Sequence, residues 1–144
     1  MVPYARHSPR PTVRFDLAVK PQKVDAMPGQ IVVVHDDAEF LKENVTTLQC
    51  AGYDVVAFTD SMTATDVLLN SSHIELLITR VRFPDNTPNG VALGRMARIR
   101  RPGIKVLFTS FPDVHEHIDG VGEYLPRPFS QEELLAVVGW MLDQ

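Results

Sequence analysis

Apolar residues follow two alternating patterns from Gln30 onward. Short, nearly continuous apolar runs are typical of strands buried on both faces of a sheet, and they alternate with segments whose apolar positions recur every three or four residues, as in helices. The runs predict strands over residues 31–34, 54–58, 74–79, 104–109 and 121–125, and the periodic segments predict helices over residues 38–51, 61–70, 91–100 and 130–142. Strands that alternate with helices favour parallel pairing through right-handed crossovers. We therefore predict an α/β fold with helices on both faces of a five-stranded parallel sheet.

The helical segments carry more detailed expectations. Ser130, with Glu133 three residues later, has the pattern of a capping box, so the last helix is expected to begin there. Cys50 lies on an apolar helix and is expected in the core. The helix over residues 91–100 is expected to direct four apolar residues inward: Leu93, Met96, Ala97 and Ile99.

The first 29 residues differ in composition from the rest of the chain. Residues 1–30 carry five basic and two acidic residues, a charge of +3, whereas the remainder carries nine basic and sixteen acidic residues, a charge of −7. Five of the eleven prolines also fall there, so we expect residues 1–29 to form an extended arm and residues 30–144 to form the folded domain. Within the arm, apolar side chains alternate with others as in a strand: Val13, Phe15, Leu17 and Val19.

Two interpretations of the arm stay open. We expect it to dock where its alternating apolar residues are covered, by pairing with an exposed edge of the sheet within the chain or across a dimer. The alternative is that Met27 is the true start of the protein and that the preceding residues are a misassigned leader.

Composition narrows the classes of function. The chain has 144 residues, of which 44% are apolar and 22% charged, values that are ordinary for one globular domain. No apolar run approaches the ~20 residues of a membrane span, so no membrane association is expected. The single cysteine excludes an internal disulfide and suits the reducing cytoplasm. A net charge of −4 disfavours nucleic acid as a partner.

Polar and charged side chains follow four of the predicted strands. In a doubly wound sheet, ligands bind at the carboxyl ends of the strands, where the strand order reverses. We therefore expect the functional residues among those that follow the first, third, fourth and fifth strands: His35, Asp36, Asp37, Arg80, Thr109, Ser110 and Arg127.

Four segments, in this order, resemble the receiver domains of two-component response regulators over residues 30–144. An acidic turn, His35-Asp36-Asp37, follows the first strand, and the interval from Ile31 to Gly52 matches the family's first helix in length. Residues 106–110 resemble the family's fourth strand with its switch hydroxyl, and residues 124–129 resemble its aromatic-x-x-Lys-Pro-Phe segment. The resemblance implies the flavodoxin-like receiver fold, a three-layer doubly wound sheet in the strand order 2-1-3-4-5.

The resemblance also implies a chemistry, from which this chain departs. In the family, a carboxylate after the third strand accepts a phosphoryl group from a phosphohistidine, an acidic pair helps to hold a magnesium ion, and a lysine pairs with the phosphate. Thr109 and Tyr124 keep the residue types of the family's switch pair. However, Arg80 stands at the phosphoacceptor position, Arg127 at the lysine position and His35 at the first acidic position.

These departures change what the site is expected to do. Arginine stays protonated and is no nucleophile toward a phosphoryl donor. Two carboxylates and two arginines sum to zero charge, whereas three carboxylates and one lysine sum to about −2 and need a cation. We expect an acidic pocket of Asp36 and Asp37 that Arg80 neutralises through an ion pair with one of them, and no cofactor; magnesium would bind only if the pocket keeps weak affinity. The alternatives are a helix N-cap for the two aspartates and a purely structural role for Thr109 and Tyr124.

The sequence favours a phosphorylation-independent receiver-like module, a pseudo-receiver that acts by protein–protein interaction in a bacterial two-component pathway and is not an enzyme. The expected partners are a histidine kinase, a phosphotransfer protein, an output protein or a second copy of the chain. They are expected to bind the face made by the segment after Thr109, the fifth strand and the last helix, with Phe111, Val114 and Tyr124 as contacts.

Other functions remain as alternatives. One alternative is a working phosphoacceptor that uses Asp36, Asp37 or Asp85. The other is a flavodoxin-type domain that binds a small ligand. Residues 111–119 leave room for a reduced helix at best. His115 and His117 are expected to be surface residues, because no third metal ligand is spaced to join them.

Overall fold

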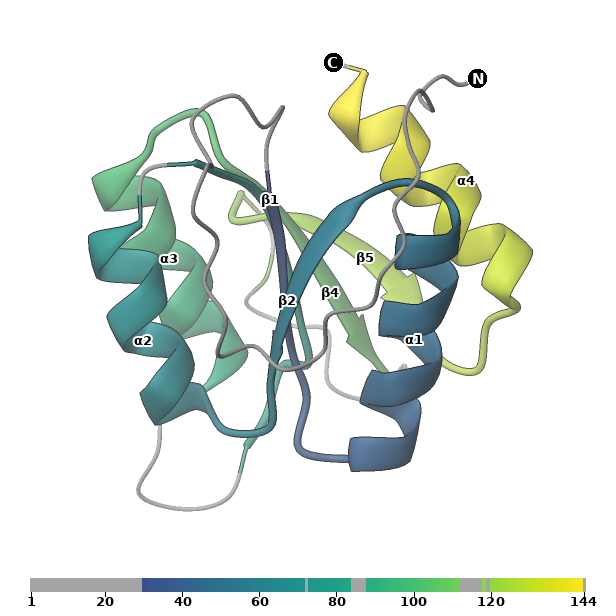
Figure 1. The fold of residues 1–144 in the computed structure, drawn as a ribbon. Helices are drawn as coiled ribbons and strands as arrows, with labels where there is room; N and C mark the ends of the chain where they lie inside the picture. Colours follow the sequence, from purple (N-terminus) through teal and green to yellow (C-terminus); the bar gives the residue numbers. More distant parts are fainter. Residues whose placement is uncertain (1–29, 72, 84–87, 112–117, 119, 144) are drawn as a thin grey trace.

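Figure 1 shows a computed structural model of the chain, which describes residues 30–71, 73–83, 88–111, 118 and 120–143. Within these ranges the strands are β1 (Gln30–Val34), β2 (Asp54–Phe58), β3 (Ile74–Thr79), β4 (Lys105–Ser110) and β5 (Glu123–Pro126). The helices are α1 (Ala38–Cys50), α2 (Ser61–Asn70), α3 (Gly90–Arg100) and α4 (Gln131–Leu142).

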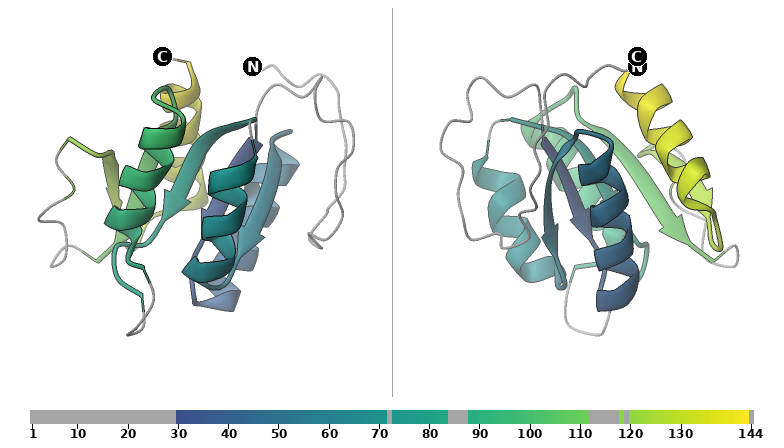
Figure 2. Two further views of the ribbon diagram at one scale, coloured as in Figure 1. Left: turned by 90° about the vertical axis from the view of Figure 1, so that its left-hand side faces the viewer. Right: turned by 45° about the vertical axis from the view of Figure 1, so that its right-hand side comes forward.

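The strands form one parallel sheet in the order β2-β1-β3-β4-β5. Helices α1 and α4 cover one face of this sheet, and α2 and α3 cover the other (Figures 1 and 2). The predicted fold class and strand order are therefore confirmed. The order reverses between β1 and β3, so the carboxyl ends of these two central strands open onto the edge where this type of sheet binds its ligands.

Alternate residues of β1 point into the two apolar layers. Val32 and Val34 join the cluster beneath α2 and α3, whereas Ile31 and Val33 join the cluster beneath α1 and α4. All four side chains are at most 2% exposed. This burial on both faces is what a continuous β-branched run predicts, and it holds the end of β1 in a fixed position at the candidate site.

Side-chain caps fix the start of each described helix at the same edge of the sheet. Asp37, Asp60 and Asn89 accept hydrogen bonds from backbone N–H groups in the first turns of α1, α2 and α3. At α4, Ser130 and Glu133 form both hydrogen bonds of the predicted capping box, at 3.0 and 2.8 Å. The segments that carry the site residues are therefore anchored at both ends.

Two apolar side chains lie elsewhere than predicted. Ile99, which was expected to point inward, is 80% exposed, because it lies on the side of α3 opposite to the buried Leu93. Cys50, which was expected in the core, is exposed at the end of α1, because the buried stripe of this helix runs through Val45 and Leu48 on the opposite side. The element boundaries agree with the predicted ones within two residues.

Several expectations concern residues outside the described ranges. They include the arm over residues 1–29 and its docking, most of the segment 111–119 with His115 and His117, and the loop residue Asp85. Among the described helices, none is long and apolar enough to cross a membrane.

Candidate functional site

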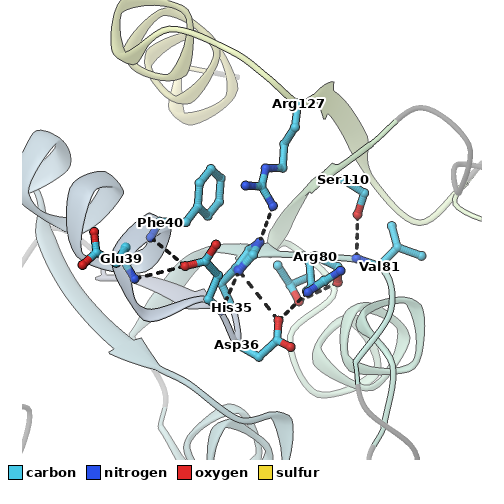
Figure 3. Close-up of polar contacts among 10 residues, drawn as sticks. His35, Asp36, Glu39, Phe40, Arg80, Val81, Ser110 and Arg127 are labelled. Atoms are coloured by element: carbon cyan, nitrogen blue, oxygen red, sulfur yellow. Dashed lines mark hydrogen bonds and ion pairs between the residues drawn. The ribbon is translucent and has the colours of Figure 1, made fainter.

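Charged side chains from three strand ends meet at the carboxyl edge of the sheet. His35, Asp36 and Asp37 follow β1, Arg80 follows β3, and Arg127 follows β5. Figure 3 shows Arg80 directed at Asp36 and Arg127 directed at His35. The sequence therefore identified a group of residues that the fold brings together, although their contacts differ in part from those expected.

Arg80 forms an ion pair with Asp36. Its Nη1 lies 2.5 Å from Oδ1 of Asp36, and both side chains are 31% exposed. The start of α3 lies tightly against Arg80, since a Cβ at Gly90 would collide with the carbonyl oxygen of Arg80. The ion pair that we predicted from the charge balance of the site is thus present in the structure. Its position, half-buried at the end of the sheet, makes it better shielded from water than a surface pair.

Asp37 takes a different role from Asp36. Its Oδ1 accepts hydrogen bonds from the backbone N–H groups of Glu39 and Phe40, at 3.1 and 3.2 Å, and so caps α1. These bonds, above all the one from Phe40, hold the pKa of the Asp37 carboxyl below its usual value. The sequence grouped Asp36 and Asp37 in one acidic pocket and left the N-cap as an alternative. In the structure Asp37 is the N-cap, and Asp36 is the member of the pair that contacts Arg80.

His35 is buried at the centre of the cluster, with 1% of its surface exposed. Burial, together with the nearby charges of Arg80 and Arg127, lowers its pKa to about 4. The imidazole is therefore neutral near pH 7. Its Nδ1 lies 3.2 Å from the backbone N of Asp37 and 3.9 Å from Oδ1 of Asp36, and its Nε2 lies 3.4 Å from Nη1 of Arg127.

These contacts place two donors against one imidazole. A neutral imidazole offers a single acceptor nitrogen, so the backbone N–H of Asp37 and the guanidinium of Arg127 compete for it. Only one of them forms a hydrogen bond with His35 in a given tautomer. His35 thus connects Arg127 to the Asp36–Arg80 pair without carrying charge itself.

Arg127 is held mainly by aromatic rings. The carbon at the centre of its guanidinium lies 3.9 Å from the ring centre of Phe40 and 4.7 Å from that of Phe111. Phe40 also contacts His35, with ring centres 4.4 Å apart, and the edge of Phe129, at 5.6 Å. A flat, weakly hydrated guanidinium suits such a cage better than an ammonium group would. The sequence predicts a helix over residues 38–51, and its helical spacing alone does not distinguish Phe40 as a site residue.

The hydroxyl groups at the end of β4 connect neighbouring strands. Thr109, which the sequence singled out, is buried with 1% exposed surface. Ser110 makes the visible connections: its Oγ accepts the backbone N–H of Val81, at 2.9 Å, and its carbonyl oxygen accepts the Tyr124 hydroxyl and the backbone N–H of Arg127, both at 3.0 Å. Ser110 therefore ties β4 to β5 and to the segment after Arg80, a role that the sequence did not reveal.

An open groove of about 630 Å³ leads from Arg127 between α1 and α4. Phe40 and Arg127 line one part of it, and Glu39 and Glu43 add acidic side chains from α1. Arg80 and Asp36 do not line this groove.

The donor set at the site does not fit a magnesium ion. Magnesium requires oxygen ligands in a near-octahedral arrangement, usually including one or two free carboxylates. Here Asp36 is paired with Arg80, Asp37 is bonded to the backbone of α1, and a neutral histidine occupies the remaining position after β1. Within the described part of the chain, no three histidine, cysteine, aspartate or glutamate residues are grouped so that they could hold a metal ion.

Comparisons with known proteins agree with this architecture. No family model matches the chain. The response regulator MprA of Mycobacterium sp. (strain KMS) is 30% identical over 115 residues, which cover 76% of this chain and 49% of that protein. The chain therefore spans about half the length of the curated relatives that it matches.

Solved structures give a closer match in length. A response regulator receiver protein from Sinorhizobium medicae WSM419 superimposes with a TM-score of 0.74 at 25% identity, covering 82% of this chain and 97% of that one. A CheY-like receiver domain protein from Methanospirillum hungatei JF-1 shares the fold with a TM-score of 0.72 at 23% identity, covering 81% and 95%. The strand order and these matches show that the chain has the CheY-like receiver fold of response regulators.

Proposed function

We propose that this receiver domain signals without being phosphorylated, as a pseudo-receiver that acts by binding other proteins. The observation that carries the proposal is the ion pair between Arg80, directly after β3, and Asp36. In the receiver family the position after the third strand holds the carboxylate that accepts the phosphoryl group. A guanidinium is no nucleophile, and its charge stands where a metal ion would otherwise neutralise Asp36.

The charge balance of the whole cluster supports the same function. Asp36 is neutralised by Arg80, Asp37 by the N-terminus of α1, and His35 is neutral. Arg127 is held by aromatic rings rather than by an anion. A phosphoryl donor with its metal ion would have to displace Arg80 from Asp36 before either could bind.

The competing function, phosphoryl transfer to another carboxylate, is less well supported. Asp36 directs Oδ1 at Arg80, and Asp37 directs Oδ1 at two backbone N–H groups. In-line transfer requires a nucleophile in a fixed and open position. Both carboxylates are already engaged in these contacts, and Asp85 lies outside the described residues.

We propose further that partners bind the face that includes Phe111, β5 and α4. Phe111 is 50% exposed and Trp140 of α4 is 55% exposed, although both are large apolar side chains. The Tyr124 hydroxyl, bonded to the carbonyl of Ser110, links this face to the site. The partners that fit are a histidine kinase, a phosphotransfer protein or an output protein of a cytoplasmic two-component pathway, or a second copy of the chain. Val114, the other expected contact, lies outside the described residues.

Intact-mass spectrometry after incubation with acetyl phosphate and magnesium tests the main proposal. The protein is expected to gain no phosphoryl mass, while a receiver domain that has the family's aspartate, labelled in parallel, gains one. A phosphoryl adduct on this chain would contradict the proposal, and peptide mapping would then assign it to Asp36, Asp37 or Asp85. Sedimentation at increasing concentration tests the second copy as partner: a monomer throughout would exclude it and leave the other partners.

A further inference from the structure

Strand β2 forms an edge of the sheet that is apolar along most of its length. Among the described strands it pairs with β1, so its outer backbone groups face away from the sheet. After Asp54 it consists of Val55, Val56, Ala57 and Phe58, of which Val55 alone is buried and the others are half-buried. Unprotected apolar edges of this kind invite pairing with another strand.

The opposite edge of the sheet is protected. Strand β5 has four residues, begins with the exposed Glu123 and ends with Pro126, which has no N–H to donate. Short length, charge and proline are the devices by which natural sheets prevent pairing at their edges. Strand β2 has no proline and no charge beyond its first residue. The two edges therefore differ, and β2 is the one that requires a cover.

We propose that residues 12–19 of this chain cover β2 as a sixth strand, antiparallel to it and in the same molecule. Four apolar residues alternate within this segment, as expected of a strand with one apolar face: Val13, Phe15, Leu17 and Val19. With Lys20 opposite Asp54, that face would lie beside Val55 and Ala57 and would extend the apolar layer beneath α1. The inference concerns a different surface from the proposed function and does not depend on it.

The length of the intervening chain allows this arrangement and sets its direction. Ten residues, 20–29, connect the segment to Gln30, which lies beside Asp54 at the start of β2. The link must pass two strand spacings, about 10 Å, and ten extended residues reach about 33 Å. A segment parallel to β2 would also be parallel to β1, and parallel strands of one sheet are joined by a dozen or more residues. The ten-residue link therefore favours a segment that ends near the start of β1 and runs antiparallel to β2.

Charge favours the same direction. An antiparallel segment brings Lys20 toward Asp54 at the start of β2 and Arg14 toward Asp60, which follows the end of β2. The arm as a whole is positive and the rest of the chain negative, so the attraction is general as well as local, although salt weakens it.

Hydrogen exchange of the full chain, followed by mass spectrometry, tests the proposal. In the wild-type protein, residues 13–19 and 54–58 should both be protected. Leu17→Pro removes a backbone donor and an apolar side chain from the predicted strand, so exchange should become about tenfold faster or more in both segments. Ser8→Pro, in the proline-rich part of the arm outside this strand, is the matched control and should change neither.

Three results would overturn the proposal. One is wild-type exchange of residues 13–19 as fast as that of residues 2–8, a measurement that does not require any variant to fold. Another is protection of residues 54–58 that is the same in the wild type and in Leu17→Pro. The third is protection of residues 54–58 that falls on dilution while the protein changes from dimer to monomer, because the edge would then be covered by a second copy.

Discussion

Protonation of His35 is expected to destabilise the domain as the pH falls from 7 to 5. The imidazole is 1% exposed, and its pKa is lowered from 6.5 to about 4, first by burial and then by Arg80 and Arg127. The unfolded chain regains the ordinary pKa and therefore binds a proton at pH values where the folded domain does not. This contribution to stability is complete above pH ~6.5 and is lost as the pH falls toward 4.

The two pKa values give the size of the effect. A group with a pKa of 6.5 in the unfolded state and about 4 in the folded state lowers the free energy of unfolding by about 2 kcal/mol between pH 7 and pH 5, and by about 3 kcal/mol once the pH is below 4. A domain of this size has a total stability of about 5–15 kcal/mol. The loss at pH 5 is therefore a large fraction of the total and is well within the precision of denaturant unfolding.

Urea unfolding at pH 7, 6 and 5 measures this loss. The wild type should lose about 2 kcal/mol more than His35→Gln over this range, because glutamine cannot take up the proton. His73 is exposed, so His73→Gln is the matched control and should follow the wild type. An NMR titration of the His35 ring in the wild type provides an independent value of its pKa.

Other titrating groups do not obscure the comparison. Backbone hydrogen bonds lower the pKa values of Asp37 and Asp60, so acidification reduces the free energy of unfolding through these groups only below their ordinary pKa. Burial raises the pKa of Glu75, so acidification increases the free energy of unfolding through this group. All three are present in every variant, and the lowered pKa values of the two aspartates lie below the pH range of the experiment. Equal pH slopes for the wild type and His35→Gln, or a wild type that gains stability on acidification relative to that variant, would refute the role assigned to His35.

Three further predictions concern the site and its supports. Arg80→Asp combined with Arg127→Lys restores the family's charges and should bring back magnesium binding, measured by calorimetry, whereas the wild type should bind no magnesium. A double variant that binds no magnesium would show that the positions are misassigned. Gly90→Ala places a methyl group against the Arg80 carbonyl and should cost more than about 2 kcal/mol in urea unfolding, whereas Gly103→Ala, which meets open space, should cost far less; equal losses would contradict the close approach of α3. Ser130→Ala removes one bond of the capping box and should lower stability by about 1 kcal/mol, with an unchanged melting temperature as the opposing result.

The fold could be predicted because each layer is encoded locally. The run from Ile31 to Val34 has no polar position, so it had to be buried on both faces, and its alternate residues do enter the two cores. Strand–helix alternation then restricted the topology to right-handed parallel crossovers. The predictions that Ile99 and Cys50 are buried were wrong. Each helix has more apolar residues than its inner face can hold, and the sequence does not indicate which apolar residue remains exposed.

The site could be predicted only as a set of neighbours. The sequence brought Arg80 and Asp36 to adjacent strand ends, and a net charge of zero made their pairing the expected outcome. It could not distinguish the two aspartates, because the choice depends on which carboxylate points at the first N–H groups of α1, and the backbone conformation at the start of the helix sets this. Nor could it place Phe40 and Phe111 on either side of Arg127, since a cage of this kind joins three elements that are distant along the chain.

In the proposed pseudo-receiver, Arg127 stands where the family has a lysine, and this difference gains significance from the aromatic cage. A lysine ammonium is a compact, strongly hydrated charge that needs water or an anionic oxygen around it, and in the family the phosphoryl group supplies one. A guanidinium lies flat against aromatic rings and is stabilised there without an anion, as Arg127 is between Phe40 and Phe111. Under the proposed function, Arg80 stands in place of the group that would be phosphorylated, and Arg127 is stabilised without a phosphate. The two substitutions are therefore complementary, and together they favour a domain that keeps one charge-balanced state and leaves regulation to the proteins that bind it.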